Sequence, residues 1–162
     1  MPRRILFVCL GNICRSPAAE GVMRVRLPGY EYDSAGTSGW HVGEPPYPPM
    51  RRAAAARGYP IDDLRARQFS PGDFDAFDLI VTMDDHNLAA VEAMRPQGSD
   101  TRVLRCVDFL TAPVSDHVPD PYYTGDFETV LDMLEDATPG LELAMKQAET
   151  GGVLSKTKSG RS

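Results

Sequence analysis

Apolar positions along the chain follow two different spacings. Continuous apolar runs at 3–8 and 77–83 predict buried strands, the alternating segment 30–35 predicts a third, and the short run at 101–106 predicts a fourth. Between these segments, apolar residues recur at the three- and four-residue spacing of helices. The chain therefore predicts strands and helices in regular alternation.

Turn-forming residues mark where the helices are expected to begin and end. Ser16 is the predicted N-cap of the first helix, Pro17 its first residue, and the helix should end at Pro28-Gly29. The other helices are expected at 50–57, at 84–95, and from Phe127 onward with an interruption or restart at 138–140, and the segment 112–125 is expected to be a loop.

The resulting order, βαβαβαβα, predicts an α/β fold: an open four-stranded parallel sheet with helices on both faces, joined by right-handed crossovers. Residues 1–149 are expected to form one domain, and 150–162 a disordered tail. Ligands of such sheets bind beyond the carboxyl ends of the strands. The first predicted strand leads at that end into the stretch CLGNICRSP, residues 9–17.

Composition and charge exclude several classes of protein. Of the 162 residues, 42% are hydrophobic, without a signal peptide or a membrane-length apolar run, and three cysteines lack the spacing of a disulfide framework. These features predict a cytoplasmic protein. The net charge is −6, and residues 1–150 alone carry 14 basic against 23 acidic side chains. No nucleic-acid or membrane partner is expected, because both need a basic face.

The loop after the first strand combines an anion cradle with a nucleophile. Gly11 and Asn12 can adopt positive φ angles, which would curl the loop around an anion at the helix N-terminus. The same amides would stabilise a thiolate on Cys9. Arg15 could bind two oxygens of a phosphate, and the Ser16 hydroxyl could donate to the Cys9 sulfur. No Walker pattern and no C-x2-C pair occur, so neither a cofactor nor a metal is expected.

These residues, in the pattern Cys-x5-Arg-Ser, resemble the signature of the low-molecular-weight protein tyrosine phosphatases. The similarity extends to SAGTSGWHVG at 34–43, MDDHN at 83–87 and DPYYTGDFE at 120–128. It implies the phosphotyrosine protein phosphatase I-like, Rossmann-like fold and hydrolysis of phosphotyrosine monoesters through a phosphocysteine on Cys9. The phosphate-binding loop would then comprise Leu10, Gly11, Asn12, Ile13, Cys14, Arg15 and Ser16.

Asp120 is the expected general acid and base. It is the only aspartate followed by proline, and Tyr122 and Tyr123 would keep its surroundings apolar enough to favour the protonated form. The resemblance places Trp40 on one wall of the substrate crevice and the two tyrosines on the other. It also gives Ser34 and Asp84 supporting roles.

The resemblance implies further properties of the chain. Cys14 would form a reversible disulfide with Cys9. Besides the phosphotyrosine protein substrate, the resemblance implies either a bacterial tyrosine kinase as a partner or host proteins as substrates after secretion. The three histidines are expected to lie outside the chemistry. Two departures from the family pattern are Leu64, where a histidine commonly supports the loop, and Tyr47-Pro48-Pro49 in place of Asp-Pro-Arg.

Two other functions fit part of this pattern. An arsenate reductase of the same fold also uses a Cys-x5-Arg loop, but it needs a downstream cysteine pair, and only Cys106 follows. A non-catalytic phosphotyrosine-binding module would need neither Cys9 nor Asp120. A monomeric phosphatase is therefore the leading prediction.

Overall fold

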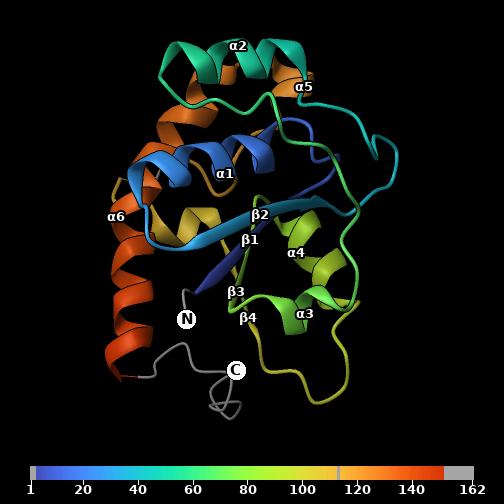
Figure 1. The fold of residues 1–162 in the computed structure, drawn as a ribbon, viewed down its shortest axis with the longest axis vertical. Coiled ribbons are helices and arrows are strands. Elements are labelled where there is room, and N and C mark those ends of the chain that lie inside the picture. The colour runs from blue at the N-terminus through green and yellow to red at the C-terminus, as the bar shows by residue number, and fades with distance from the viewer. Residues whose placement is uncertain (1–2, 113, 152–162) are drawn as a thin grey trace.

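The computed structural model describes residues 3–112 and 114–151 and places four parallel strands at the centre of the molecule (Figure 1). All four predicted strands are confirmed to within two residues at each end. Their order in the sheet is β2-β1-β3-β4, so β1 pairs with both β2 and β3. The strands are β1 (Arg4–Cys9), β2 (Glu31–Gly36), β3 (Leu79–Thr82) and β4 (Arg102–Arg105).

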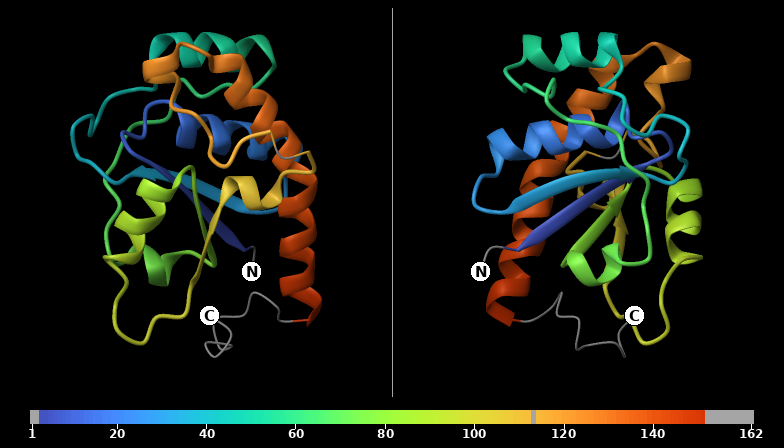
Figure 2. Two further views of the ribbon diagram at one scale, coloured as in Figure 1. Left: turned by 180° about the vertical axis from the view of Figure 1, so that it is seen from behind. Right: turned by 45° about the vertical axis from the view of Figure 1, so that its right-hand side comes forward.

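Helices cover both faces of this sheet, as the alternating order predicts (Figures 1 and 2). Helices α1 and α6 pack on one face, and α3 and α4 lie on the other. The helices are α1 (Arg15–Arg26), α2 (Pro48–Ala56), α3 (Asp73–Ala76), α4 (Asp85–Glu92), the 3-10 helix η1 (Cys106–Phe109), α5 (Pro121–Thr124) and α6 (Phe127–Gly151).

Strand β1 shows why the apolar run had to be continuous. Ile5 and Phe7 join the hydrophobic cluster under α1 and α6, whereas Leu6 and Val8 join the cluster under α3 and α4. All four side chains are at most 1% exposed. Because successive side chains of a strand point to opposite faces, a strand buried on both sides has no polar position to alternate with.

Three short helices were not predicted, and α2 begins earlier than expected. Helix α5 lies inside the segment predicted to be loop, and α3 and η1 each span four residues. Helix α2 starts at Pro48 rather than Met50 because Pro48 and Pro49 occupy its first positions, where the missing N–H costs no hydrogen bond. The departure at Tyr47-Pro48-Pro49 thus forms a helix start.

Helix α6 contradicts the expected interruption at 138–140. It continues past Pro139, although a proline inside a helix costs about 3 kcal/mol. On either side, Leu134 and Leu141 are at most 1% exposed, and burying each leucine stabilises the helix by about 2 kcal/mol. Gly140 lies so close to η1 that an added Cβ would be 2.3 Å from the carbonyl oxygen of Phe109. The packing of these residues therefore outweighs the tendency of Pro139 to break the helix.

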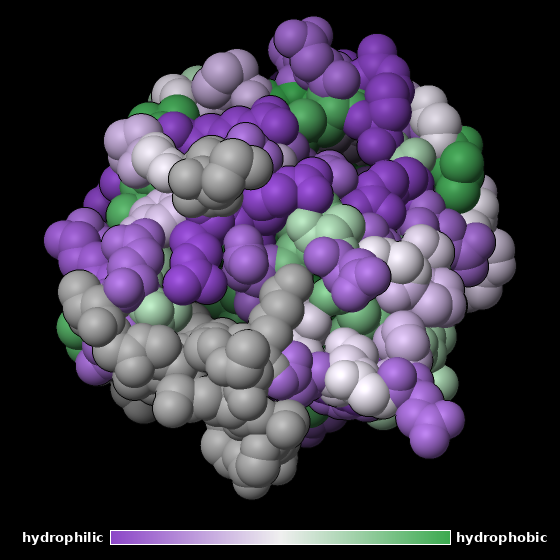
Figure 3. Space-filling view, turned by 60° about the horizontal axis from the view of Figure 1, so that its bottom comes forward, coloured by the Kyte–Doolittle hydropathy of each residue, from purple (hydrophilic) through white to green (hydrophobic). Residues whose placement is uncertain are grey.

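Helix α6 ends at the last described residue, and the surface near that end is mostly polar (Figure 3). Helix α6 includes the first two residues of the predicted tail, and residues 152–162 lie outside the described residues. Within the described ranges, no helix is both long and apolar enough to cross a bilayer. Figure 3 shows the lower end of Figure 1, where hydrophilic residues predominate and hydrophobic ones form only small groups.

Candidate active site

The loop between β1 and α1 curls around the sulfur of Cys9. Asn12 has φ of 58°, and its backbone N–H donates a hydrogen bond to Cys9 Sγ at 3.3 Å. The expectation of a positive φ is confirmed for Asn12 and wrong for Gly11. At Gly11 an added Cβ would lie 3.1 Å from the ring of His41, so that ring would have to move by a few tenths of an ångström.

Ser16 contacts the same sulfur from the first turn of α1. Its Oγ lies 3.0 Å from Cys9 Sγ and accepts a hydrogen bond from Asn12 Nδ2 at 2.8 Å. The prediction that Ser16 is the N-cap is wrong: Cys14 occupies that position, and no described side chain caps the helix. The Ser16 hydroxyl is engaged with the cysteine, which leaves the uncapped helix start able to bind an anion.

Arg15 is a buried cation with spare hydrogen-bonding capacity. Its side chain is 3% exposed, and Nη1 donates to Asp84 Oδ2 at 2.7 Å and to the carbonyl oxygen of Val118 at 3.0 Å. Nη2 lies 3.4 Å from Asp120 Oδ2. The buried Nε has no partner among the described residues. A buried donor without a partner is costly, so this atom suits an incoming oxyanion.

Asp84 holds Arg15 in place and begins helix α4. Its Oδ1 accepts a hydrogen bond from the backbone N–H of Asn87 at 2.8 Å, the contact of an N-cap. Burial alone would raise the pKa of Asp84, but hydrogen bonds from Arg15 and Asn87 lower it below its ordinary value. The carboxylate is therefore ionised at neutral pH and opposes the charge of the guanidinium.

Asp120 lines the same pocket as Cys9 and is the N-cap of α5. Its Oδ1 accepts from the backbone N–H of Tyr122 at 3.1 Å, and Pro121 is the first residue of the helix. The side chain is 25% exposed. Asp120 thus has a fixed backbone and a carboxylate that ligands can reach.

A single pocket contains the loop and Asp120 and is walled by aromatic rings. Trp40, which is 72% exposed, lines it together with Tyr122 and Tyr123, whose rings pack edge-to-face at 5.3 Å. Exposed rings of this kind can contact a flat aromatic ligand. The lining residues are Cys9, Leu10, Gly11, Ile13, Cys14, Arg15, Trp40, His41, Asp120, Tyr122 and Tyr123.

Comparison with known proteins shows which family has this sequence and fold. The sequence model of the low molecular weight phosphotyrosine protein phosphatases matches residues 4–150. The chain belongs to this family. A low molecular weight protein-tyrosine-phosphatase from Streptomyces coelicolor is 42% identical, with 93% of this chain and 98% of the relative covered.

Solved structures agree with the family assignment. A protein tyrosine phosphatase from Entamoeba histolytica, crystallised with Hepes in its active site, superposes with a TM-score of 0.84 at 39% identity, covering 91% of this chain and 99% of that one. YfkJ from Bacillus subtilis gives 0.83 at 38% identity, covering 93% and 98%. The predicted parallel fold and phosphatase class are thus confirmed.

The three cysteines of this phosphatase are all buried and free. Burial, followed by the nearby charge of Cys9, raises the pKa of the Cys14 thiol, and burial raises the pKa of Cys106 to about 12. Both are therefore neutral thiols at physiological pH. The Cys9–Cys14 disulfide stays a prediction.

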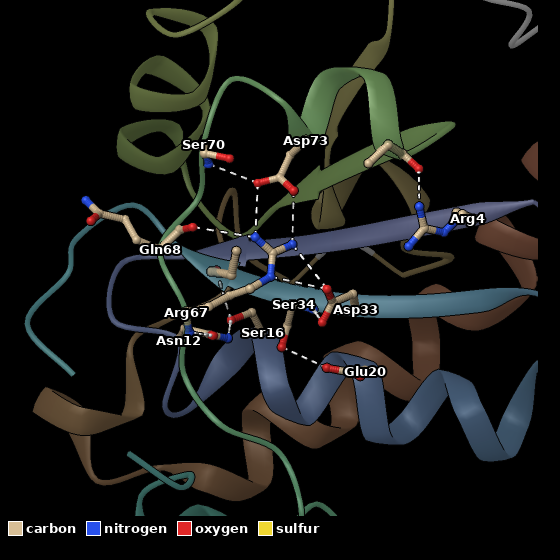
Figure 4. Close-up of polar contacts among 12 residues, drawn as sticks. Arg4, Asn12, Ser16, Glu20, Asp33, Ser34, Arg67, Gln68, Ser70 and Asp73 are labelled. Carbon is tan, nitrogen blue, oxygen red and sulfur yellow. Dashed lines mark hydrogen bonds and ion pairs between the residues drawn. The ribbon is translucent and has the colours of Figure 1, made fainter. Parts of the chain in front are cut away.

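Ser34 of the phosphatase is linked to α1 rather than to the loop. Its Oγ donates to Glu20 Oε1 at 2.8 Å (Figure 4), and Glu20 also pairs with Arg24. Leu64, the second departure from the family pattern, packs against the hydrophobic core beside the same helix. Neither side chain has a described polar contact with the phosphate-binding loop.

Sequence reasoning missed three residues that shape the site. His41 lines the pocket, and its Nδ1 is 3.0 Å from Glu44 Oε1; that it takes no part in the chemistry stays a prediction. Gly36 approaches the loop so closely that an added Cβ would be 2.8 Å from the Leu10 carbonyl oxygen. The backbone N–H of Arg67 donates to Asn12 Oδ1 at 2.9 Å. The only sequence signal was the glycine-rich run at 34–43, which contains Gly36 and His41 but not Arg67.

The other two histidines lie close to the site without lining the crevice. His86 and His117 border a second hollow that shares Arg15 and Asp120 with the first. Within the described ranges, no group of three or more acidic, cysteine or histidine side chains could hold a metal ion. The ionisable side chains that line the crevice are those of Cys9, Cys14, Arg15, His41, Asp120, Tyr122 and Tyr123.

Proposed function

We propose that this enzyme hydrolyses phosphotyrosine monoesters in proteins by double displacement on Cys9. The observation that supports the proposal best is the position of Cys9 Sγ, which lies 3.3 Å from an N–H and 3.0 Å from a hydroxyl in a pocket lined by Arg15 and Asp120. Both neighbours can donate to a thiolate, which is the nucleophilic form of cysteine.

In the first step the Cys9 thiolate attacks phosphorus and the bond to the tyrosine oxygen breaks. Asp120, protonated, gives its proton to the departing phenolate. Arg15 binds two oxygens of the phosphoryl group, with Nε available for one of them. The bound phosphate competes with Asp120 for Nη2, which is 3.4 Å away in the structure, and this frees the carboxyl group to hold a proton.

In the second step a water molecule attacks the phosphocysteine. The Asp120 carboxylate accepts a proton from that water, the S–P bond breaks, and inorganic phosphate leaves. Cys9 returns as a thiolate, stabilised by the Asn12 N–H and by the Ser16 hydroxyl. The cycle thus uses Cys9, Arg15 and Asp120, the two groups that contact the sulfur, and water.

The aromatic walls favour an aryl phosphate over an alkyl one. Trp40 and Tyr123, each more than 70% exposed, would lie against a phosphotyrosine ring, whereas a phosphoserine is too short to carry its phosphate to Cys9 and still contact them. The substrate is a phosphotyrosine protein, and the kinase that phosphorylates it is the implied bacterial partner. A cytoplasmic location and a monomeric state stay predictions.

The experiment compares turnover of p-nitrophenyl phosphate and a phosphotyrosine peptide in EDTA for the wild type, Cys9→Ser and Asp120→Ala. We expect no detectable turnover by Cys9→Ser and a kcat lower by about 100-fold or more in Asp120→Ala. The matched control is Asp116→Ala, an aspartate of the same segment that is 92% exposed and should leave kcat unchanged.

Two outcomes would favour the alternatives. Reduction of arsenate coupled to thioredoxin, without ester hydrolysis, would indicate the reductase. Tight binding of the phosphotyrosine peptide without turnover would indicate a binding module. Full activity of Cys9→Ser would refute the phosphocysteine mechanism itself.

A further inference from the structure

One backbone segment joins strand β2 to the phosphate-binding loop. Gly36 N–H donates to the carbonyl oxygen of Arg67 at 2.8 Å, and Phe69 N–H donates to the carbonyl oxygen of Gly36 at 2.7 Å. The N–H of Arg67 points to the other side and donates to Asn12 Oδ1 at 2.9 Å. Arg67 is therefore the residue through which this segment holds the loop.

The hydrogen bond from Arg67 determines the orientation of the Asn12 side-chain amide. A backbone N–H can only donate, so the amide oxygen of Asn12 must face Arg67 and its nitrogen must face Ser16. Ser16 Oγ then accepts from Asn12, and its own proton has two acceptors in reach, Cys9 Sγ at 3.0 Å and the carbonyl oxygen of Ala35 at 3.4 Å. The Arg67 N–H thus fixes the orientation of the Asn12 amide and the direction of its bond to Ser16. When Cys9 is ionised its sulfur can only accept, so the shorter of the two Ser16 contacts then carries the hydroxyl proton.

The side chain of Arg67 is clamped between two carboxylates (Figure 4). It forms a bidentate pair with Asp73, with distances of 3.0 and 3.1 Å, and its Nε and Nη2 lie 3.2 and 3.1 Å from Asp33 Oδ2. Asp73 is only 8% exposed and also accepts from the backbone N–H of Ser70 at 2.9 Å. Asp33 belongs to β2, so the clamp fixes Arg67 against the sheet.

We propose that Arg67 is a positioning residue for Cys9. The clamp of Asp33 and Asp73 holds the Arg67 N–H against Asn12, which keeps Asn12 in its left-handed conformation and directs the Ser16 hydroxyl to the sulfur. This role rests on the proposed function of Cys9 as the nucleophile, and it adds a residue whose side chain lies outside the crevice.

The test measures kcat and KM for p-nitrophenyl phosphate, the rate of Cys9 alkylation by iodoacetate between pH 5 and 9, and thermal stability. Because small displacements of reacting groups cost about 10- to 100-fold in rate, we expect Arg67→Ala to lower kcat by that factor. KM should change less than about threefold, since Arg15 still binds the phosphate. In Arg67→Ala the rate of Cys9 alkylation at pH 6, divided by the rate at pH 9, should be lower than in the wild type.

The matched control is Arg95→Ala. Arg95 is similarly placed, with a side chain 25% exposed against 34% for Arg67, an ion pair to Glu92 and hydrogen bonds to two carbonyl oxygens. It should lose stability without changing kcat or the alkylation profile. If Arg67→Ala also lost only stability, the inference would be overturned.

A double-mutant cycle with Asn12→Ala makes the test sharper. If Arg67 acts through Asn12, the double variant should be within about twofold of Asn12→Ala alone, and losses that multiply in full would contradict the proposal. Should Arg67→Ala not fold, Arg67→Lys replaces it: lysine lacks the bidentate fork, so we expect the same changes at smaller size, and wild-type behaviour would overturn the inference.

Alkylation separates this inference from the proposed function. Iodoacetate reacts with the Cys9 thiolate whether or not the protein hydrolyses phosphotyrosine. A wild type without phosphatase activity would refute the function, and the alkylation profiles of the Arg67 variants would still decide whether Arg67 positions the thiolate.

Discussion

Glu20 offers a quantitative test of the electrostatics beneath the loop. Its side chain is 2% exposed, and burial raises its pKa to about 6 from 4.5, against the opposing effects of Ser34 and Arg24. A carboxyl group with a raised pKa in the folded state binds its proton more tightly there than in the unfolded chain. Its contribution to stability is complete below about pH 4.5 and is lost as the pH rises through 6.

The size of this effect follows from the shift. Each pKa unit corresponds to 1.36 kcal/mol, so the difference between 4.5 and about 6 amounts to about 2 kcal/mol. Replacing Glu20 with glutamine keeps an acceptor for the Ser34 hydroxyl and removes the ionisation. The free energy of unfolding of Glu20→Gln, relative to the wild type, should therefore increase by about 2 kcal/mol between pH 4.5 and pH 7.5.

The assay is urea unfolding followed by circular dichroism at several pH values in this range. Glu142→Gln is the matched control, because Glu142 also pairs with a basic residue four positions later but is 43% exposed. It should show no such change with pH. Equal pH dependences for the wild type and Glu20→Gln would refute the argument from burial.

Three further substitutions or reactions test the site. Gly36→Ala should lower stability by about 2 kcal/mol and reduce kcat, because the new Cβ would lie 2.8 Å from a carbonyl oxygen of the loop; unchanged urea midpoint and kcat would contradict this. Asp84→Ala should cost about 3 kcal/mol in unfolding free energy, since it leaves the buried Arg15 without its main partner, and a stability equal to wild type would argue against that pairing. Iodoacetamide at pH 7 should label Cys9 first, as mass spectrometry can show, because burial raises the pKa of Cys14; equal labelling of both would exclude a selectively stabilised thiolate.

The sequence alone was sufficient to predict the parallel sheet and to place Cys9 and Arg15 on the loop between β1 and α1. Strands β1 and β3 are buried on both faces, so their apolar residues are consecutive and stand out from any helical spacing. Cys9 and Arg15 lie on one short loop, where covalent connection already keeps them near each other. Asp120 was recognisable only through its proline and its resemblance to the family pattern.

Tertiary structure decided the features that depend on distant contacts. Ser16 has the chemistry of an N-cap, but the nearby sulfur of Cys9 engages its hydroxyl instead. Pro139 signals a break, yet packing on both sides keeps α6 continuous. The role of Arg67 carries no local signal, because its contacts with Asn12 and Asp33 span 55 and 34 residues and only its pair with Asp73 is near in sequence. Spacing along the chain reports which residues are buried, whereas which of them meet depends on strand register and on how the crossovers fold back.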